Sequence, residues 1–206
     1  VEIMVWAIQN YSNFDYDVTS FTVARNKVDG MRANFVLDRR LNTREFLREL
    51  AFQSRCAIWL NDNKFFLQFL PEEPVAVDTI TESDIEVDSL TLSSIDTEKL
   101  VTKFVALWKS NGDQAEPNKV ILRYNVEKYG IHEEEYDFFI YNQYDFVAKA
   151  AEFWMIRKAN SYKILRCRLF INKLKLEAFD PVSFDLEAGL IANSAVTGIV
   201  QKAIYD

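Results

Sequence analysis

The hydrophobic periodicity of the chain changes near residue 161, and this change constrains the fold more than any other feature. Across residues 143–161 the apolar side chains recur at three- and four-residue spacing, which predicts an amphipathic helix. Across residues 166–184 they alternate with charged residues, so that Cys167, Leu169 and Ile171 share one face, which predicts antiparallel strands. We expect the helix to cover the apolar face of these strands, and the sequence therefore predicts an α+β fold.

A second helix, over residues 42–55, is predicted to lead into a hairpin. Asn42 and Glu45 have the spacing of a capping box at its start, and the apolar side chains that follow line one face. Two apolar runs, 56–60 and 64–70, then flank a short polar segment whose residues favour a turn. We therefore expect a compact helix–hairpin module in this part of the chain.

Prolines and acidic residues directly after the hairpin predict a stiff, solvated linker that divides the chain. Residues 1–74 are predicted to form a small α+β helix–hairpin module. Residues 75–206 are predicted to form a mainly antiparallel β-domain that includes the helix at 143–161. Within this domain we expect the strands at 101–109 and 119–126 to pair as a hairpin.

The first part of the chain carries two weaker patterns. Residues 1–12 have apolar side chains at helical spacing and predict a short helix. Residues 15–28 contain the β-formers Tyr16, Val18 and Phe21 in rough alternation and predict a strand.

The composition indicates a folded protein with an acidic surface. Apolar residues make up 49 % of the 206 residues, which argues against disorder, and the presence of only 5 glycines and 4 prolines indicates regular elements. A net charge of −7 repels phosphate, so specific nucleic-acid binding is not expected. No apolar run approaches the roughly 20 residues that span a bilayer. Residues 1–4 lack a basic segment, so the sequence predicts no signal peptide and a chain cut from a longer one.

His132 is the single histidine and precedes three consecutive glutamates at 133–135. A histidine beside carboxylates can bind a metal ion or act as a base. No second histidine and no cysteine lies nearby in the sequence, and three successive acids are typical of a solvated surface. The pattern therefore favours a structural role and predicts no metal site.

Paired carboxylates are a second candidate for chemistry, because a glycosidase holds two of them about 5–9 Å apart across a cleft. Among 31 acidic residues, several such pairs arise by chance. Close pairs in the sequence are Asp15/Asp17, Glu72/Glu73, Glu82/Asp84 and Glu86/Asp88.

The remaining patterns indicate no catalysis. Cys56 and Cys167 lie in apolar or alternating surroundings and are interpreted as buried thiols. The chain has no Gly-x-Ser-x-Gly motif and no glycine-rich phosphate loop. Its paired aromatics are expected in the core or at an interface. We therefore predict no catalytic, cofactor-binding or metal-binding residue, no cofactor, and no enzymatic activity.

Several stretches of the chain resemble bacteriophage tail hub proteins. Residues 42–56, with the hairpin after them, resemble the helix–hairpin module of that family. Residues 79–85 with 89–92, and residues 153–176 with 179–184, are similar to the body of those proteins, and residues 195–202 resemble their closing strand. The family has a Gly-Asp-Val-Val step before its last strands. Here that step reads Phe179-Asp180-Pro181-Val182, so the glycine is missing and a proline is inserted.

The resemblance implies a structural, non-enzymatic function. It implies a hub or baseplate component of a phage or prophage tail, present as a homotrimer that joins the tail tube to the tip. It also implies a tube-type β-barrel that lines the DNA channel, with other tail proteins as partners, a location in the virion tail, and assembly in the cytoplasm of the bacterial host. An acidic lumen would repel DNA and keep it from sticking.

Two other functional classes stay open at this point. The first is a carbohydrate-acting enzyme or carbohydrate-binding domain with acidic residues in a cleft. The second is a bacterial scaffold protein of a general kind. The enzyme hypothesis predicts a pocket where two carboxylates converge and one of them has a raised pKa.

Overall fold

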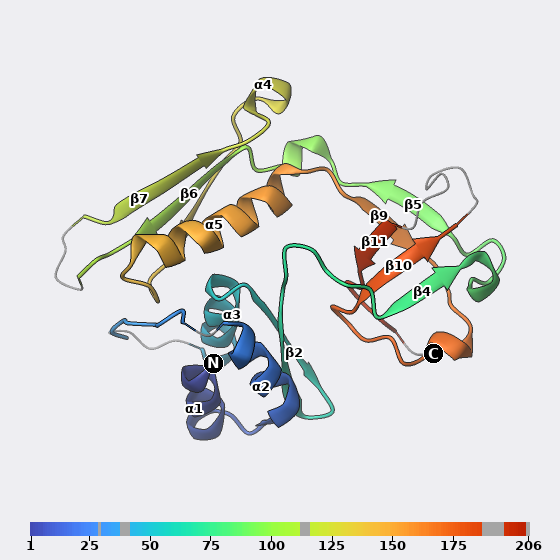
Figure 1. Cartoon of the computed structure of the whole chain (residues 1–206), viewed down its shortest axis with the longest axis horizontal. Helices are drawn as coiled ribbons and strands as arrows, with labels where there is room; N and C mark the ends of the chain where they lie inside the picture. Colours follow the sequence, from blue (N-terminus) through green and yellow to red (C-terminus); the bar gives the residue numbers. More distant parts are fainter. Residues whose placement is uncertain (29, 38–41, 112–115, 187–195, 205–206) are drawn as a thin grey trace. The chain divides into compact units, whose positions relative to one another are not determined.

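The chain packs as two compact units and runs through them alternately (Figure 1). The computed structural model describes residues 1–28, 30–37, 42–111, 116–186 and 196–204. Unit 1 comprises Val1–Leu70 and Asp96–Ser161, and unit 2 comprises Pro71–Ile95 and Tyr162–Asp206.

The α-helices of the described residues all belong to unit 1. They are α1 (Glu2–Tyr11), α2 (Val18–Lys27), α3 (Thr43–Gln53), α4 (Val126–Tyr129) and α5 (Tyr144–Ala159), with a 3-10 turn η2 (Thr97–Lys99). The helices predicted over 1–12, 42–55 and 143–161 are confirmed as α1, α3 and α5. The side chain of Asn42 accepts hydrogen bonds from the first turn of α3, as its position before the helix predicts.

Unit 1 contains two three-stranded sheets, each built on an antiparallel hairpin. The first has the order β1-β3-β2, with β1 (Asp15–Tyr16) parallel to β3 (Lys64–Phe69) and β2 (Cys56–Asn61) antiparallel to it. The second has the order β7-β6-β8, with β7 (Asn118–Arg123) antiparallel to β6 (Lys103–Trp108) and β8 (Glu133–Asp137) parallel to it. Both predicted hairpins, 56–70 and 101–126, are confirmed by these pairings.

Helix α5 packs against β6 and β7, and this contact forms much of the core of unit 1 (Figure 1). Val147, Ala150 and Ala151 of α5 are fully buried. At the far side of the core, the ring of Trp154 stacks on that of Phe52 from α3, with 4.5 Å between centroids, and its Nε1–H donates to the Phe52 carbonyl oxygen over 2.8 Å. The helix therefore joins the sheet of residues 103–137 to the preceding helix–hairpin module.

This packing differs from the interpretation that α5 covers the strands after it. The sequence places one boundary at residue 74, whereas the chain crosses between units at 70/71, at 95/96 and at 161/162. Contacts such as Phe52–Trp154 join residues that lie about half the chain apart, and local periodicity carries no signal for such contacts.

Unit 2 holds the remaining strands in two small sheets. One has the order β11-β10-β4, with β10 (Pro181–Asp185) parallel to β4 (Asp78–Thr81) and antiparallel to β11 (Val196–Ile199). The other pairs β5 (Thr91–Ser94) with β9 (Lys163–Arg166). Two 3-10 turns, η1 (Glu82–Asp84) and η3 (Ile171–Lys173), complete the unit. Its core consists of Ile80, Ile85, Leu176, Val182 and Leu186.

The strand predicted over residues 15–28 is wrong for most of its length, because residues 18–27 form α2. The carboxylate of Asp17 accepts a hydrogen bond of 2.7 Å from the amide of Ser20 and so caps this helix. Phe21 and Ala24, three residues apart, are its buried residues. The cap and this spacing outweigh the β-propensity of the branched residues.

The alternation predicted after residue 166 holds only in part. Cys167 and Leu169 pack against the core of unit 2, as expected, but Ile171 is 85 % exposed. The chain turns at η3, which breaks the two-residue period, and no strand forms over 173–178. Of the predicted closing strand at 195–202, Val196–Ile199 forms β11, and Ala195 lies outside the described residues.

The α+β class is confirmed by the helices of unit 1 and the mainly antiparallel sheets of both units. The described residues do not show the tube-type barrel that the resemblance implies. In the described ranges the strands form four separate sheets of two or three strands, and none of them closes on itself.

Candidate functional site

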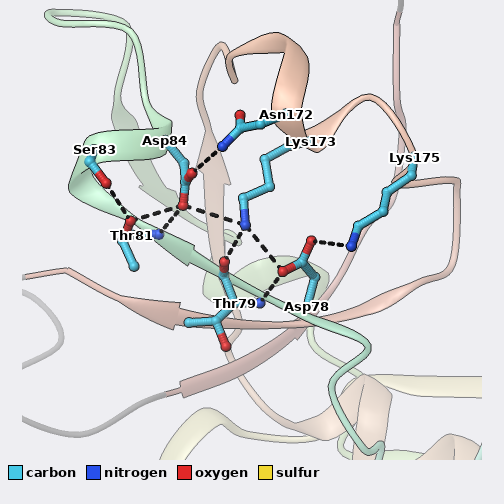
Figure 2. Close-up of polar contacts among 8 residues, drawn as sticks. All are labelled: Asp78, Thr79, Thr81, Ser83, Asp84, Asn172, Lys173 and Lys175. Atoms are coloured by element: carbon cyan, nitrogen blue, oxygen red, sulfur yellow. Dashed lines mark hydrogen bonds and ion pairs between the residues drawn. The ribbon is translucent and has the colours of Figure 1, made fainter.

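The densest group of charged side chains in unit 2 surrounds Lys173 (Figure 2). The Lys173 ammonium group lies 3.1 Å from Oδ1 of Asp78 and 3.5 Å from Oδ2 of Asp84, and it donates to the Thr79 carbonyl oxygen over 2.7 Å. These three charged side chains are largely shielded from solvent, with side-chain exposures of 11–16 %. We call this set, together with Thr81, Asn172 and Lys175, the Lys173 cluster.

The two carboxylates of the cluster have further donors. Asp84 Oδ2 accepts from both the amide and the hydroxyl group of Thr81, each over 2.9 Å, and its Oδ1 accepts from Asn172 Nδ2 over 2.7 Å. Asp78 Oδ2 lies 3.2 Å from the ammonium group of the exposed Lys175. Thr81 and Asp84 form a capping box at η1, which holds the Asp84 carboxylate in place.

These contacts hold each group in its charged form. The amide of Thr81, with Asn172 next in importance, lowers the pKa of Asp84 to about 2. Hydrogen bonding to Lys173 lowers the pKa of Asp78, and the same bond raises the pKa of Lys173. A general acid needs a carboxyl pKa raised toward neutrality, and these pKa values move in the opposite direction.

The cluster is therefore suited to fastening segments together, and its lowered carboxyl pKa values do not suit it to act as a general acid. Asp78, Thr79 and Thr81 belong to β4, Asp84 to η1, and Asn172 and Lys173 to η3 (Figure 2). The sequence analysis noted Asp84 only as one member of a carboxylate pair. The Thr81-x-x-Asp84 spacing is the local signal that could have marked it as a cap.

His132 and the glutamates after it have structural roles in unit 1. The His132 amide donates to the hydroxyl group of Thr102 over 2.8 Å, and its ring Nε2 lies 3.0 Å from the carbonyl oxygen of Tyr129. Within the described part of the chain, no group of three histidine, cysteine or carboxylate residues is placed to hold a metal ion.

Strand β8 carries the three glutamates, and two of them form ion pairs. Glu133 lies 2.7 Å from Lys103, and Glu134 lies 2.9 Å from Lys158. Burial alone would raise the pKa of Glu134, but hydrogen bonds from Tyr136 and Lys158 outweigh it and lower that pKa. The three side chains of Glu134, Tyr136 and Lys158 thus join β8 to α5.

Members of two other carboxylate pairs have surroundings that the structure describes. Asp17 is the cap of α2, as described above. Glu86 and Asp88 line an open surface hollow of about 320 Å³ together with Arg168. Among the described residues, the carboxyl groups whose pKa departs from its ordinary value are all shifted downward: Glu2, Asp78, Asp84 and Glu134.

Both cysteines are free thiols, as predicted. Burial raises the pKa of Cys56 to about 12, which suppresses the reactive thiolate. Cys167 is only half-buried, and burial raises its pKa less. In the described ranges no helix is long and apolar enough to span a membrane.

Comparison with known proteins shows a similarity in fold to a solved structure, without a similarity in sequence to a known family. No model of a protein family matches the chain, and no curated protein matches its sequence. Among solved structures, a tail protein from Neisseria meningitidis MC58 aligns over 92 % of the chain with a TM-score of 0.53 and 10 % identity. The chain shares the fold of that tail protein.

A second solved structure, prophage tail protein gp18 from Listeria monocytogenes EGD-e, aligns over 81 % of the chain with a TM-score of 0.42 and 16 % identity. The chain spans 62 % of the Neisseria protein and 48 % of the Listeria protein.

Proposed function

We propose that the chain is a structural, non-enzymatic component of a phage or prophage tail. The observation that carries this proposal is the fold that the chain shares with the Neisseria tail protein over 92 % of its length. The charged groups support it, since the carboxylates of the Lys173 cluster and of β8 are paired with lysines and hold segments together.

Within the tail, we propose the position of a hub or baseplate protein. In this role copies of the chain form a homotrimer that joins the tail tube to the tip, with other tail proteins as neighbours. The net charge of −7 fits a surface that faces the DNA channel, because an acidic wall repels the passing phosphates. Assembly takes place in the cytoplasm of the bacterial host, and the product resides in the virion tail.

The position in the particle is tested by electron microscopy. Particles released from the host that encodes the chain are labelled with an antibody against it and imaged in negative stain. Label at the junction between tube and tip supports the hub position. Label along the whole tube supports the tail function but contradicts the hub position. Label on the capsid, or on no particle, contradicts the tail function itself.

The channel and the enzyme alternative have separate tests. The purified chain should not retain double-stranded DNA on a filter at physiological salt, and retention would contradict an acidic channel wall. It should also release no reducing sugar from a panel of polysaccharides. Release that disappears in Glu86→Gln would restore the carbohydrate-acting alternative, since Glu86 lines the open hollow.

A further inference from the structure

A ridge of basic and apolar side chains follows β9 in unit 2. Arg166 and Arg168 alternate with Cys167 and Leu169, which pack against the core, so the two arginines face outward. The chain then exposes apolar side chains: Phe170 by 50 %, Ile171 by 85 % and Leu174 by 57 %. We call these outward-facing residues the basic–apolar ridge: Arg166, Arg168, Phe170, Ile171 and Leu174.

The apolar part of the ridge is held outward by the Lys173 cluster. Asn172 and Lys173 lie between the exposed residues Ile171 and Leu174, and their polar side chains turn inward to Asp84 and Asp78 (Figure 2). In this segment the usual burial of side chains is therefore reversed: the polar side chains are shielded from solvent, and the large apolar side chains are exposed. Exposed apolar groups that lie together are typical of a surface that another protein covers.

The ridge also has a charge that differs from the rest of the chain. Residues 162–176 contain five basic residues and no acidic one, in a chain of net charge −7. Lys173 and Lys175 pair with the carboxylates of the Lys173 cluster, so the charge of the ridge comes from its two arginines. Arg168 is only 3.8 Å from Glu86, in an exposed and weak pair. A covering partner that suits this ridge needs acidic groups next to apolar contact area.

Unit 1 offers a surface of that chemistry at β8, an edge strand of the sheet β7-β6-β8. Glu134 faces Lys158 of α5, so Glu133 and Glu135, which alternate with it, face the opposite side of the sheet. Both are exposed, although Glu133 is paired with Lys103 over 2.7 Å, and Ile131, just before the strand, is 68 % exposed. We call Ile131, Glu133 and Glu135 the acidic strip.

We propose that the basic–apolar ridge of one copy docks on the acidic strip of a second copy of this chain. The opposite charges of the two surfaces and the exposed apolar residues beside them identify this occupant. Because the two surfaces differ, the contact is heterologous, and repeated contacts close into a ring when the rotation between copies allows it. The inference rests on the proposed function and deepens it by naming the surfaces through which copies meet.

A charge exchange tests the contact directly. Self-association of the full chain is measured by sedimentation velocity over a wide range of concentration. Arg166→Glu alone and Glu135→Arg alone should each weaken association by roughly tenfold, because each sets like charges against one another. An equal mixture of the two variants should associate more strongly than either variant alone, since the ridge of one variant can then face a strip of opposite charge on the other. In a ring of three copies one contact stays mismatched, so the mixture should remain weaker than the wild type.

The apolar part of the ridge is tested with one variant and a matched control variant. Ile171→Ser should weaken association by roughly tenfold, the scale of a truncated interface residue. Val75→Ser, which changes an equally exposed residue of the same unit, should leave association unchanged. Circular dichroism melting of each variant checks that the fold is intact.

Three results would overturn the inference. A wild-type chain that stays monomeric at every concentration contradicts both this contact and the proposed trimer. If Arg166→Glu, Glu135→Arg and Ile171→Ser all associate as strongly as the wild type, the proposed contact is contradicted, but the proposed trimer is not. Binding of a DNA duplex that Arg166→Glu abolishes, together with unchanged association of that variant, would assign the ridge to nucleic acid.

Discussion

The ammonium group of Lys173 lies 3.1 Å from Oδ1 of Asp78, although 95 residues separate them in the sequence. Lys173→Met keeps a side chain of similar length and removes the cation, so Asp78 and Asp84 lose the charge that they share. We expect this change to lower the melting temperature of the protein by several degrees and to speed amide exchange in β4.

Lys99→Met serves as the control for this substitution, because the pair of Lys99 with Asp96 is exposed on both sides. This control should melt within about a degree of the wild type, as surface ion pairs contribute little. Equal melting temperatures for the two variants would contradict a fastening role for Lys173.

Acid should weaken unit 2 through Asp84. The pKa of Asp84 is about 2 in the folded chain and ordinarily 3.8, so the folded state binds its proton less tightly than the unfolded state. Stability from this group is complete above about pH 4 and is lost as the pH falls toward about 2. Urea midpoints measured from neutral pH downward should fall in this window, and Asp84→Asn should flatten the dependence.

Gln53 is completely buried in unit 1 and joins α3 to the segment after β8. Its Nε2 donates to the carbonyl oxygen of Asp137 and its Oε1 accepts from the amide of Ile140, each over 3.1 Å. Gln53→Leu should lower the free energy of unfolding by about 2 kcal/mol or more, because two backbone groups lose partners. Urea unfolding measures this loss. Glu49→Leu, an exposed change on the same helix, should cost less than about 0.5 kcal/mol.

Phe179 lies in the turn that precedes β10. Its φ is +73°, so the backbone has the left-handed conformation that favours glycine although the residue is a phenylalanine. Phe179→Gly should therefore be more stable than Phe179→Ala by about 1 kcal/mol, with the loss of the ring common to both. Chemical unfolding of the two variants decides this, and equal stabilities would show that the turn relaxes.

The sequence predicted local elements well and long-range contacts poorly. The 3.6-residue period of α5, the cap at Asn42 and the turn between β2 and β3 all act over a few residues, so they are visible in the sequence. The Lys173 cluster and the Phe52–Trp154 stack join residues about a hundred positions apart, and no local pattern marks them. At α2 a strong cap at Asp17 outweighed a misleading β-rich composition.

The alternation of the chain between units sets an order for its completion on the ribosome. Strand β4 is synthesised early, but its partner β10 comes only after the whole of α5 has been made. Unit 1 can therefore finish folding while the first segment of unit 2 still waits with an unsatisfied edge. The emergence of residues 170–185 then pairs β4 and delivers Lys173 to its two carboxylates, so unit 2 closes only after the segments of unit 1 have been made.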